Sequence, residues 1–275
     1  MTGKIVRIIS NLYTVDVNGK KVDCQARGKF RKDNITPLVG DVVTIDESKA
    51  YILEILKRKN ELKRPSVANV DVAVIVTSVK EPNISLSLLD KQISIVILNK
   101  IKPIICFSKL DLLNIKEKKE VKVLKKYYKK QKIKVLTNRN IYLLKRSLKN
   151  NTVVFTGQTG AGKSSLLNKI DKTLKLKTGE ISKALGRGKH TTRHVELFEN
   201  KNMYIVDTPG FSALDINEFS KEEIRDSFIE FKSYSCQFKN CMHLNELACA
   251  VKQAVNEGKI LESRYQSYKN IISGK

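Results

Sequence analysis

Positions 1–57 consist of short stretches in which apolar and polar residues alternate. Such alternation is typical of half-buried strands. Five stretches show it in part, namely KIVRIIS, LYTVDV, KKVDCQARG, VGDVVTID and AYILEIL. Asn18-Gly19 separates the second stretch from the third, and this dipeptide accepts the positive φ of a tight hairpin turn. Five short strands in so short a segment predict a small barrel of the oligonucleotide-binding (OB) or SH3-like type.

A basic loop, RGKFRKDNITPLVG, lies between the third and fourth of these strands. It places Phe30 among Arg27, Lys29, Arg31 and Lys32. Cationic side chains beside an aromatic ring suit phosphate contact and base stacking. The sequence therefore predicts a nucleic-acid contact here, with an ordinary solvated loop as the alternative.

After a charged connector at 58–69 the hydrophobic pattern changes. Continuous apolar runs predict strands that are buried on both faces, and these runs lie at 70–79, 102–107 and 152–157, with a further strand at 132–138. Helical patterns lie between the strands, at 86–100, 115–131 and 141–150. Alternating strands and helices predict an α/β fold with a doubly wound parallel sheet, whose ligands sit at the carboxyl ends of the strands.

The stretch GQTGAGKS fits the phosphate-loop pattern G-x-x-x-x-G-K-[ST] without deviation. Its glycines allow backbone N–H groups to cradle phosphate. Lys163 is predicted to reach the β- and γ-phosphates, and Ser164 to offer its hydroxyl to Mg²⁺. The remaining predicted nucleotide contacts are Gly157, Gln158, Thr159, Gly160, Ala161, Gly162 and Ser165. The alternative is a glycine-rich turn that arose by chance.

A second strand, MYIVDTPGF, ends near Asp207, which we predict to hold magnesium through water. Gly210 follows and is predicted to move its N–H towards a γ-phosphate. The polar, glycine-punctuated segment at 178–198 resembles a mobile switch, in which Thr191 or Thr192 would ligate Mg²⁺ when triphosphate is bound. A plain connecting loop is the alternative for that segment.

The stretch SKLD, at 108–111, is a variant of the Asn-Lys-x-Asp motif with which G proteins read guanine. Asp111 supplies a carboxylate that accepts from the ring N–H and the exocyclic amine, and the stem of Lys109 covers the base. Ser108 replaces the usual asparagine, so we expect the loss of an amide that ties the base motif to the phosphate loop, with reduced nucleotide affinity. In an ordinary G protein the phosphate loop comes first. The reversed order predicts a circular permutation, which is feasible because domain termini often lie close together.

Three cysteines and a histidine form a C-x₄-C-x-H-x₅-C pattern near the end of the chain: Cys236, Cys241, His243 and Cys249. Three thiolates and an imidazole make a closed tetrahedral set, which is typical of structural zinc. Unmetallated core cysteines are the alternative. Cys24 and Cys106 lie in strand patterns and are predicted to be buried packing residues.

The formal charge of +24 arises from 52 Lys+Arg against 28 Asp+Glu. This excess favours a polyanionic partner, nucleic acid or an anionic membrane, although genome bias towards lysine is an alternative. No apolar stretch approaches the ~20 residues of a membrane span, and MTGKIVRIIS lacks a cleavable apolar region. We therefore expect a cytoplasmic protein with no membrane association.

Together these features resemble the RsgA family of GTPases that depend on the small ribosomal subunit. The likeness rests on RGKFRK, KRPSVANVD, the permuted motif order, GRGKHTTRH, DTPGF and the Cys/His spacing followed by RYQSY. The resemblance implies an OB domain (1–63), a permuted GTPase domain (64–222) and a zinc-bound helical domain (223–275). It also implies a role in late maturation of the small subunit, rRNA contact, and GTP hydrolysis to GDP that the subunit stimulates. We expect a monomer. Ser108 and the stretch LTNRN depart from the family pattern.

The catalytic residue is less evident, because Phe211 stands where small G proteins carry a water-orienting glutamine. His190 is the candidate, and contact with rRNA or capping of its loop is the alternative role. Two other functions compete with the GTPase: a nucleotide-regulated RNA-binding protein with little catalysis, and an ATP-using P-loop enzyme. The intact Lys163, Ser164 and Asp207 argue against the first, and Asp111 against the second.

Overall fold

The computed structural model describes residues 1–28, 30, 35–63, 66–172, 174, 196–200, 202–206 and 215–274 of the 275-residue chain. The chain forms two compact units. The first comprises Met1–Val74, Asn140–Thr156 and Lys163–Leu214, and the second comprises Ile75–Arg139, Gly157–Gly162 and Asp215–Lys275. Each unit is assembled from segments far apart in sequence. The expected domain boundaries after residues 63 and 222 stay a prediction.

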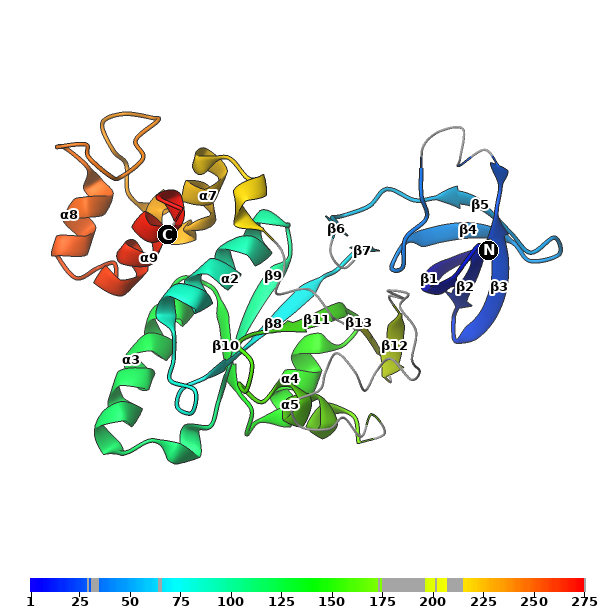
Figure 1. Cartoon of the computed structure of the whole chain (residues 1–275), viewed down its shortest axis with the longest axis horizontal. Coiled ribbons are helices and arrows are strands. Elements are labelled where there is room, and N and C mark those ends of the chain that lie inside the picture. The colour runs from blue at the N-terminus through cyan, green and yellow to red at the C-terminus, as the bar shows by residue number, and fades with distance from the viewer. Residues whose placement is uncertain are drawn as a thin grey trace. The chain divides into compact units, whose positions relative to one another are not determined.

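Five strands in the first unit close into a barrel in the order β1-β2-β3-β5-β4 (Figure 1). They are β1 (Thr2–Ile9), β2 (Leu12–Val17), β3 (Lys20–Ala26), β4 (Val42–Asp46) and β5 (Tyr51–Ile55). Neighbouring strands pair antiparallel except β3 and β5, which are parallel. The predicted small barrel is confirmed, and its closure removes the open strand edges that invite association.

Alternate side chains of these strands fill the barrel, as the sequence pattern predicts. Its fully buried residues include Ile5, Val15, Cys24, Val43 and Ile52. Asn18 and Gly19 both have positive φ, at 53° and 90°, which confirms the predicted hairpin turn. Cys24 is therefore a packing residue, as expected.

Residues 58–69 are not the simple charged connector that the sequence predicts. An antiparallel hairpin forms there from β6 (Glu61–Lys63) and β7 (Ser66–Ala68). Leu62 and Val67 pair across it, and both are buried. Strands of three residues within a charged segment show too little alternation to be recognised, so the tertiary contacts of this hairpin decide its structure.

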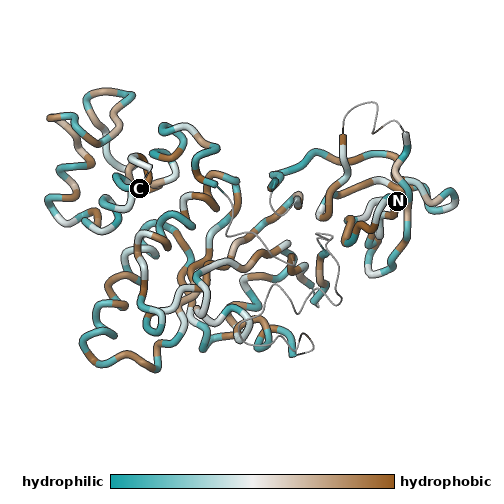
Figure 2. Tube along the Cα trace, viewed as in Figure 1, coloured by the Kyte–Doolittle hydropathy of each residue, from teal (hydrophilic) through white to brown (hydrophobic). Residues whose placement is uncertain are grey.

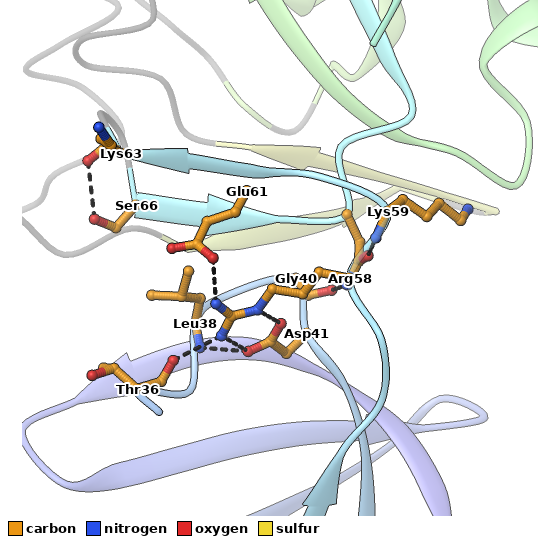
Figure 3. A network of polar contacts seen from close by, with 10 residues as sticks. Thr36, Leu38, Gly40, Asp41, Arg58, Lys59, Glu61, Lys63 and Ser66 are labelled. Carbon is orange, nitrogen blue, oxygen red and sulfur yellow. Dashed lines mark hydrogen bonds and ion pairs between the residues drawn. The ribbon is translucent and has the colours of Figure 1, made fainter. Parts of the chain in front are cut away.

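Arg58 ties this hairpin to the barrel (Figure 3). Its Nε and Nη2 donate to the two carboxylate oxygens of Asp41, each at 2.8 Å. Its Nη1 donates to Glu61 at 2.6 Å, and Nη2 also donates to the backbone oxygen of Thr36 at 2.7 Å. Asp41 is fully buried, and a bidentate guanidinium–carboxylate pair fixes orientation as well as distance.

A six-stranded sheet follows, in the order β10-β9-β8-β11-β13-β12. Its strands are β8 (Val72–Ser78), β9 (Lys102–Ser108), β10 (Lys134–Thr137), β11 (Thr152–Thr156), β12 (Leu197–Asn200) and β13 (Met203–Val206). β9 pairs in parallel with β10, and β11 with β13. Every residue of β8 and β11 is buried, and Figure 2 colours these central strands as hydrophobic. The predicted parallel sheet is confirmed.

The edge strand β12 was not predicted. It begins at the last two positions of the expected switch segment, 197 and 198, and ends at Asn200. It pairs antiparallel with β13, from Leu197 opposite Val206 to Asn200 opposite Met203. A four-residue strand in a polar segment has no clear sequence signal, because its partner supplies the hydrogen bonds that hold it.

The predicted helices between the strands are confirmed: α2 (Leu86–Leu98), α3 (Ile115–Lys130) and α4 (Ile141–Leu148), with α5 (Lys163–Ile170) after the phosphate loop. Capping residues set the first turns of three of them. Ser85, Asn114 and Asn140 each accept from a backbone N–H three residues on. Such caps satisfy N–H groups that a helix leaves unpaired.

Among the helices that the structure describes, none combines the length and the apolar character of a membrane span.

Within the first unit, the barrel contacts the hairpin formed by β12 and β13. Lys21 lies between Asp16 and Glu199, with N–O distances of 3.0 and 3.1 Å. The hydroxyl of Tyr204 also donates to Asp16, at 3.1 Å. Lys4 lies 4.6 Å from the centroid of the Tyr204 ring, a cation–π contact. These contacts join the barrel to both β12 and β13.

The C-terminal segment of the second unit is helical, as predicted, with α7 (Lys221–Ser227), η4 (Ile229–Ser233), α8 (Ala250–Asn256) and α9 (Glu262–Ile272). Arg264 of α9 donates to Glu230 at 2.7 Å and to Asp90 of α2 at 2.9 Å. All three side chains are almost completely buried. This ion-pair network joins the C-terminal helices to α2.

Candidate nucleotide site and metal centre

The phosphate-loop sequence leaves the end of β11 and enters α5 at Lys163. Gly157 begins the loop with a φ of +133°, and a Cβ there would lie 2.0 Å from the backbone oxygen of Val76. Only glycine fits a position with both constraints. The strand–loop–helix context that the motif requires is therefore present.

Helix α5 opens with Lys163 and Ser164. Burial lowers the pKa of Lys163, since a part-buried ammonium has lost water. Ser164 is buried at the start of the helix, where the backbone N–H groups and the helix dipole favour an anion. Thr159 and Ser165 are exposed, and Gln158 is half-buried. A phosphate bound at this position would pair with the ammonium.

Ser108 joins the base motif to the phosphate loop. Its Oγ donates to the backbone oxygen of Ala161 at 2.6 Å, across 53 positions in the sequence. Ser108 is 1% exposed and Ala161 is fully buried, so water does not compete for this bond. The expectation that serine here loses the tie to the phosphate loop is therefore wrong, because the hydroxyl makes it.

Lys109 and Asp111 follow at the carboxyl end of β9. Lys109 has a left-handed φ of 57°, and its Nζ donates to the backbone oxygen of Glu81. Asp111 belongs to the short helix η1 (Leu110–Leu112), and its side chain is 65% exposed. The carboxylate is thus presented to solvent a few residues from the tie at Ser108.

Two residues at this edge were missing from the predicted site. Arg139 Nη2 lies 3.9 Å from Asp111 Oδ1. Asn138 Oδ1 is buried and, among the described residues, has no hydrogen-bond partner. Both directly follow β10, so their position after a predicted strand, at the ligand-binding edge of a parallel sheet, was the available signal.

The four residues of the Cys/His pattern converge in the second unit. Their ligand atoms all lie within 4.8 Å of one another. His243 Nδ1 is 3.3 Å from the sulfurs of Cys241 and Cys249 and 3.6 Å from that of Cys236. The sulfurs of Cys236 and Cys249 are 3.8 Å apart, too far for a disulfide. A tetrahedral zinc site requires S–S separations of about 3.8 Å and S–N separations of about 3.5 Å.

Neighbouring groups hold His243 in this position. Tyr265 donates to its backbone oxygen at 2.6 Å, and the ring of Phe231 meets the imidazole edge-on with centroids 5.3 Å apart. Burial lowers the pKa of His243 and keeps the imidazole neutral, the form that binds a metal. The donor set and its surroundings fit a metal ion.

The sequence matches two protein-family models over adjoining stretches. Residues 2–52 match the RsgA N-terminal domain, and residues 55–217 match the RsgA GTPase. The chain belongs to the RsgA family. It is a small ribosomal subunit biogenesis GTPase, an enzyme that hydrolyses GTP, which confirms the family and the function predicted from the sequence.

Relatives in this family share most of the chain. The small ribosomal subunit biogenesis GTPase RsgA of Caldanaerobacter subterraneus subsp. tengcongensis is 46% identical over 281 residues, covering 98% of this chain and 94% of its own. RsgA of Bacillus cereus is 45% identical over 280 residues, covering 98% and 96%.

Two solved RsgA-like structures share the fold. YjeQ from Thermotoga maritima superposes with a TM-score of 0.87 at 35% identity, covering 99% of this chain and 97% of that one. YloQ, described as a circularly permuted GTPase, gives 0.85 at 35% identity, covering 99% and 94%. The permuted order explains why the base motif at 108–111 precedes the phosphate loop at 157–164. The predicted permutation is confirmed.

Several predicted RsgA site residues lie outside the described residues. They are His190, Thr191, Thr192, Asp207, Gly210 and Phe211, together with Lys29, Arg31 and Lys32 of the basic loop. Their roles stay predictions.

Proposed function

We propose that this GTPase binds GTP with Asp111 reading guanine and the loop at 157–165 holding the phosphates. The observation that carries the proposal is the hydrogen bond from Ser108 to Ala161, because it ties the base motif to the phosphate loop. The exposed carboxylate of Asp111 accepts from the two guanine donors that adenine lacks. Lys109 covers the base, and Lys163 pairs with the phosphates.

Magnesium accompanies the nucleotide in this proposal. Ser164 at the start of α5 offers a hydroxyl, with Thr192 and Asp207 as the further partners. The ion would neutralise charge on the β- and γ-phosphates. Gly210 would contact the γ-phosphate through its N–H.

The metal held by Cys236, Cys241, His243 and Cys249 is proposed to be one structural zinc ion per chain. The atom separations support zinc, and four protein ligands leave no position for a catalytic water. The ion would fix the segment that precedes α8 and α9.

The partner is proposed to be the small ribosomal subunit late in its maturation, bound by a cytoplasmic monomer through its rRNA. The net charge of +24 supports contact with a polyanion, and the barrel with its basic loop is the proposed contact with RNA phosphates. The predicted base stacking by Phe30 is wrong, because this ring is buried in the barrel core. The subunit would stimulate hydrolysis by ordering the segment that contains His190, whose imidazole would then orient the attacking water.

Nucleotide specificity, with and without isolated small subunits, tests this function. We expect GTP to outcompete ATP, with slow intrinsic hydrolysis and faster hydrolysis on subunits. Asp111→Asn should lose the preference for GTP and improve use of xanthosine triphosphate, because xanthine presents a carbonyl where guanine has an amine. Equal binding of ATP and GTP by the wild type would refute the guanine assignment. Normal GTP binding without stimulation would instead favour a nucleotide-regulated RNA-binding protein.

A further inference from the structure

Helix α3 carries an unusual concentration of lysine. Eight lysines and only two acidic residues lie in this helix, Ile115–Lys130. One of the two acids, Glu117, already has partners. Lys80 Nζ donates to its two carboxylate oxygens at 2.9 and 3.1 Å, and the backbone N–H of the capping residue Asn114 donates to it as well. Only Glu120 remains to offset the lysines on a helix of about 24 Å.

Three of these lysines line one side of the helix and face a hollow. Lys118, Lys122 and Lys125 are spaced i, i+4 and i+7, which places them on one face. Arg139, from the turn after β10, lines the same hollow, whose volume is about 330 Å³. We call these four residues the cationic stripe. They come from α3 and from the turn after β10, within one compact unit, and the fold brings them together.

Apolar side chains also line the hollow. Leu110 and the buried Val121 are among its lining residues, together with Thr137. An ordinary solvated lysine face spreads its charges over a convex surface, where water and salt separate them. Here four cations line one recess.

Among the described residues, little negative charge matches the cationic stripe. None of its three lysines forms an ion pair with a described residue, and Arg139 has Asp111 at 3.9 Å, with both side chains more than 60% exposed. Lys125 is half-buried, and its pKa is lowered by burial and then by the neighbouring charges of Lys129 and Arg139. Cations held this close repel one another, so an anion bound among them would relieve the repulsion.

We propose that the cationic stripe is a second RNA-binding surface, which binds the phosphodiester backbone independently of the barrel. Its lysines advance by about 4.5–6 Å along the helix axis, which suits a row of phosphates better than one small anion. None of the described residues that line the hollow is aromatic, so we expect contact with the charged backbone of the RNA and not with its bases. This inference rests on the proposed rRNA contact and adds a surface on the GTPase portion.

A pair of charge-matched triple variants tests the proposal. Lys118→Gln/Lys122→Gln/Lys125→Gln removes three charges from the stripe. Lys119→Gln/Lys126→Gln/Lys130→Gln removes three exposed lysines from an adjacent face of the same helix, about 90° around its axis. The two variants have the same net charge and near-equal helix propensity, so long-range attraction changes equally in both.

Binding of each full-length variant to isolated small ribosomal subunits and to a short synthetic RNA duplex is measured over a range of salt. The stripe variant should lose roughly tenfold or more in affinity for both probes, and its salt slope should fall by about 2–3. The control should change by less than about threefold. Because these lysines lie outside the proposed nucleotide contacts, basal GTP hydrolysis should be unchanged and also reports that the fold is intact.

Equal losses in the two variants would overturn the proposal, because general electrostatics would then explain the binding. A loss on subunits without a loss on the RNA duplex would also overturn it, since the partner would then be a ribosomal protein. If the stripe variant fails to fold, the single variants Lys118→Gln and Lys122→Gln, at exposed positions, test the stripe, and each should weaken duplex binding about threefold. Wild-type protein that does not bind subunits at all would instead refute the proposed function.

Discussion

Ser108 and Ala161 form a buried hydrogen bond, with Oγ 2.6 Å from the backbone oxygen, that joins the base motif to the phosphate loop. Ordinary G proteins have asparagine in the position of Ser108. The shorter serine side chain makes the tie because β9 ends close to the loop.

We predict that Ser108→Ala weakens GTP binding by roughly tenfold. The substitution leaves the oxygen of Ala161 buried without this donor, at a cost of about 1–3 kcal/mol. Titration with a fluorescent GTP analogue measures the change. Ser94→Ala is the control, because Ser94 Oγ is also buried but has no hydrogen-bond partner among the described residues. Unchanged affinity in Ser108→Ala would show that the tie does not support nucleotide binding.

The second prediction concerns the switch histidine. His190→Ala should slow subunit-stimulated hydrolysis by roughly two orders of magnitude, because a positioned side chain would no longer orient the water. GTP affinity and subunit binding should stay near wild type. Single-turnover hydrolysis on saturating subunits separates the chemical step from recruitment. His194→Ala, in the same segment, is the matched control. A wild-type rate in His190→Ala would remove this residue from the mechanism.

A third prediction follows from the metal centre. Cys236→Ser should lower the zinc content from about one per chain and loosen the C-terminal helices, because structural zinc contributes folding free energy. Elemental analysis and limited proteolysis report the two effects, while GTP binding should persist. Cys106→Ala removes a buried cysteine outside the cluster and should retain zinc. Wild-type protein that contains no zinc after purification without chelators would contradict the assignment.

The buried network of Arg264 gives a fourth prediction. Arg264→Met should destabilise the fold by about 3–5 kcal/mol, because Glu230 and Asp90 would be left buried without their cation. Chemical denaturation measures the change. Combining Arg264→Met with Glu230→Gln and Asp90→Asn should recover much of the loss, since no uncompensated charge remains.

An exposed ion pair provides the control for this network. Lys20 pairs with Glu47 on the barrel surface, and Lys20→Met should have almost no effect on unfolding. Equal destabilisation by Lys20→Met and Arg264→Met would mean that burial of an ion pair does not determine the free energy lost when its cation is removed.

The fifth prediction is a pH dependence at the contact between the barrel and the β12–β13 hairpin. Burial alone would raise the pKa of Asp16, but hydrogen bonds from Lys21, the Gly19 N–H and Tyr204 outweigh it, and the pKa lies below its usual value. A lowered carboxylate pKa stabilises the fold above the unfolded-state pKa near 4 and loses that contribution as pH falls through the folded-state value. Asp16→Asn should therefore cost about 1–3 kcal/mol at neutral pH.

Urea unfolding of the wild type and Asp16→Asn at several pH values tests this dependence. The difference between the two proteins should shrink as pH falls below about 4. Glu54→Gln is a control, because Glu54 is an exposed carboxylate of β5 that has no hydrogen bond or ion pair with a described residue. A difference that is constant down to low pH would show that the carboxylate charge is not responsible.

The sequence by itself determined the elements with strong periodicity or fixed chemistry. Alternation identified the five barrel strands, and continuous apolar runs identified β8, β9 and β11, because burial on one face or two leaves a regular pattern. The phosphate loop and the Cys/His spacing identified their sites, since few residue types satisfy that chemistry. The permuted order was also readable from the sequence.

The tertiary structure decided what depends on partners distant in sequence. The hairpin β6–β7 and the strand β12 are too short to carry a pattern, and Arg58, Asp41 and neighbouring strands supply their stability. The consequence of serine at position 108 could not be read from the sequence, because the reach of a hydroxyl depends on how closely two chain segments approach. The cationic stripe also depends on the tertiary structure, because Arg139 lies beside the α3 lysines only where β10 ends next to that helix.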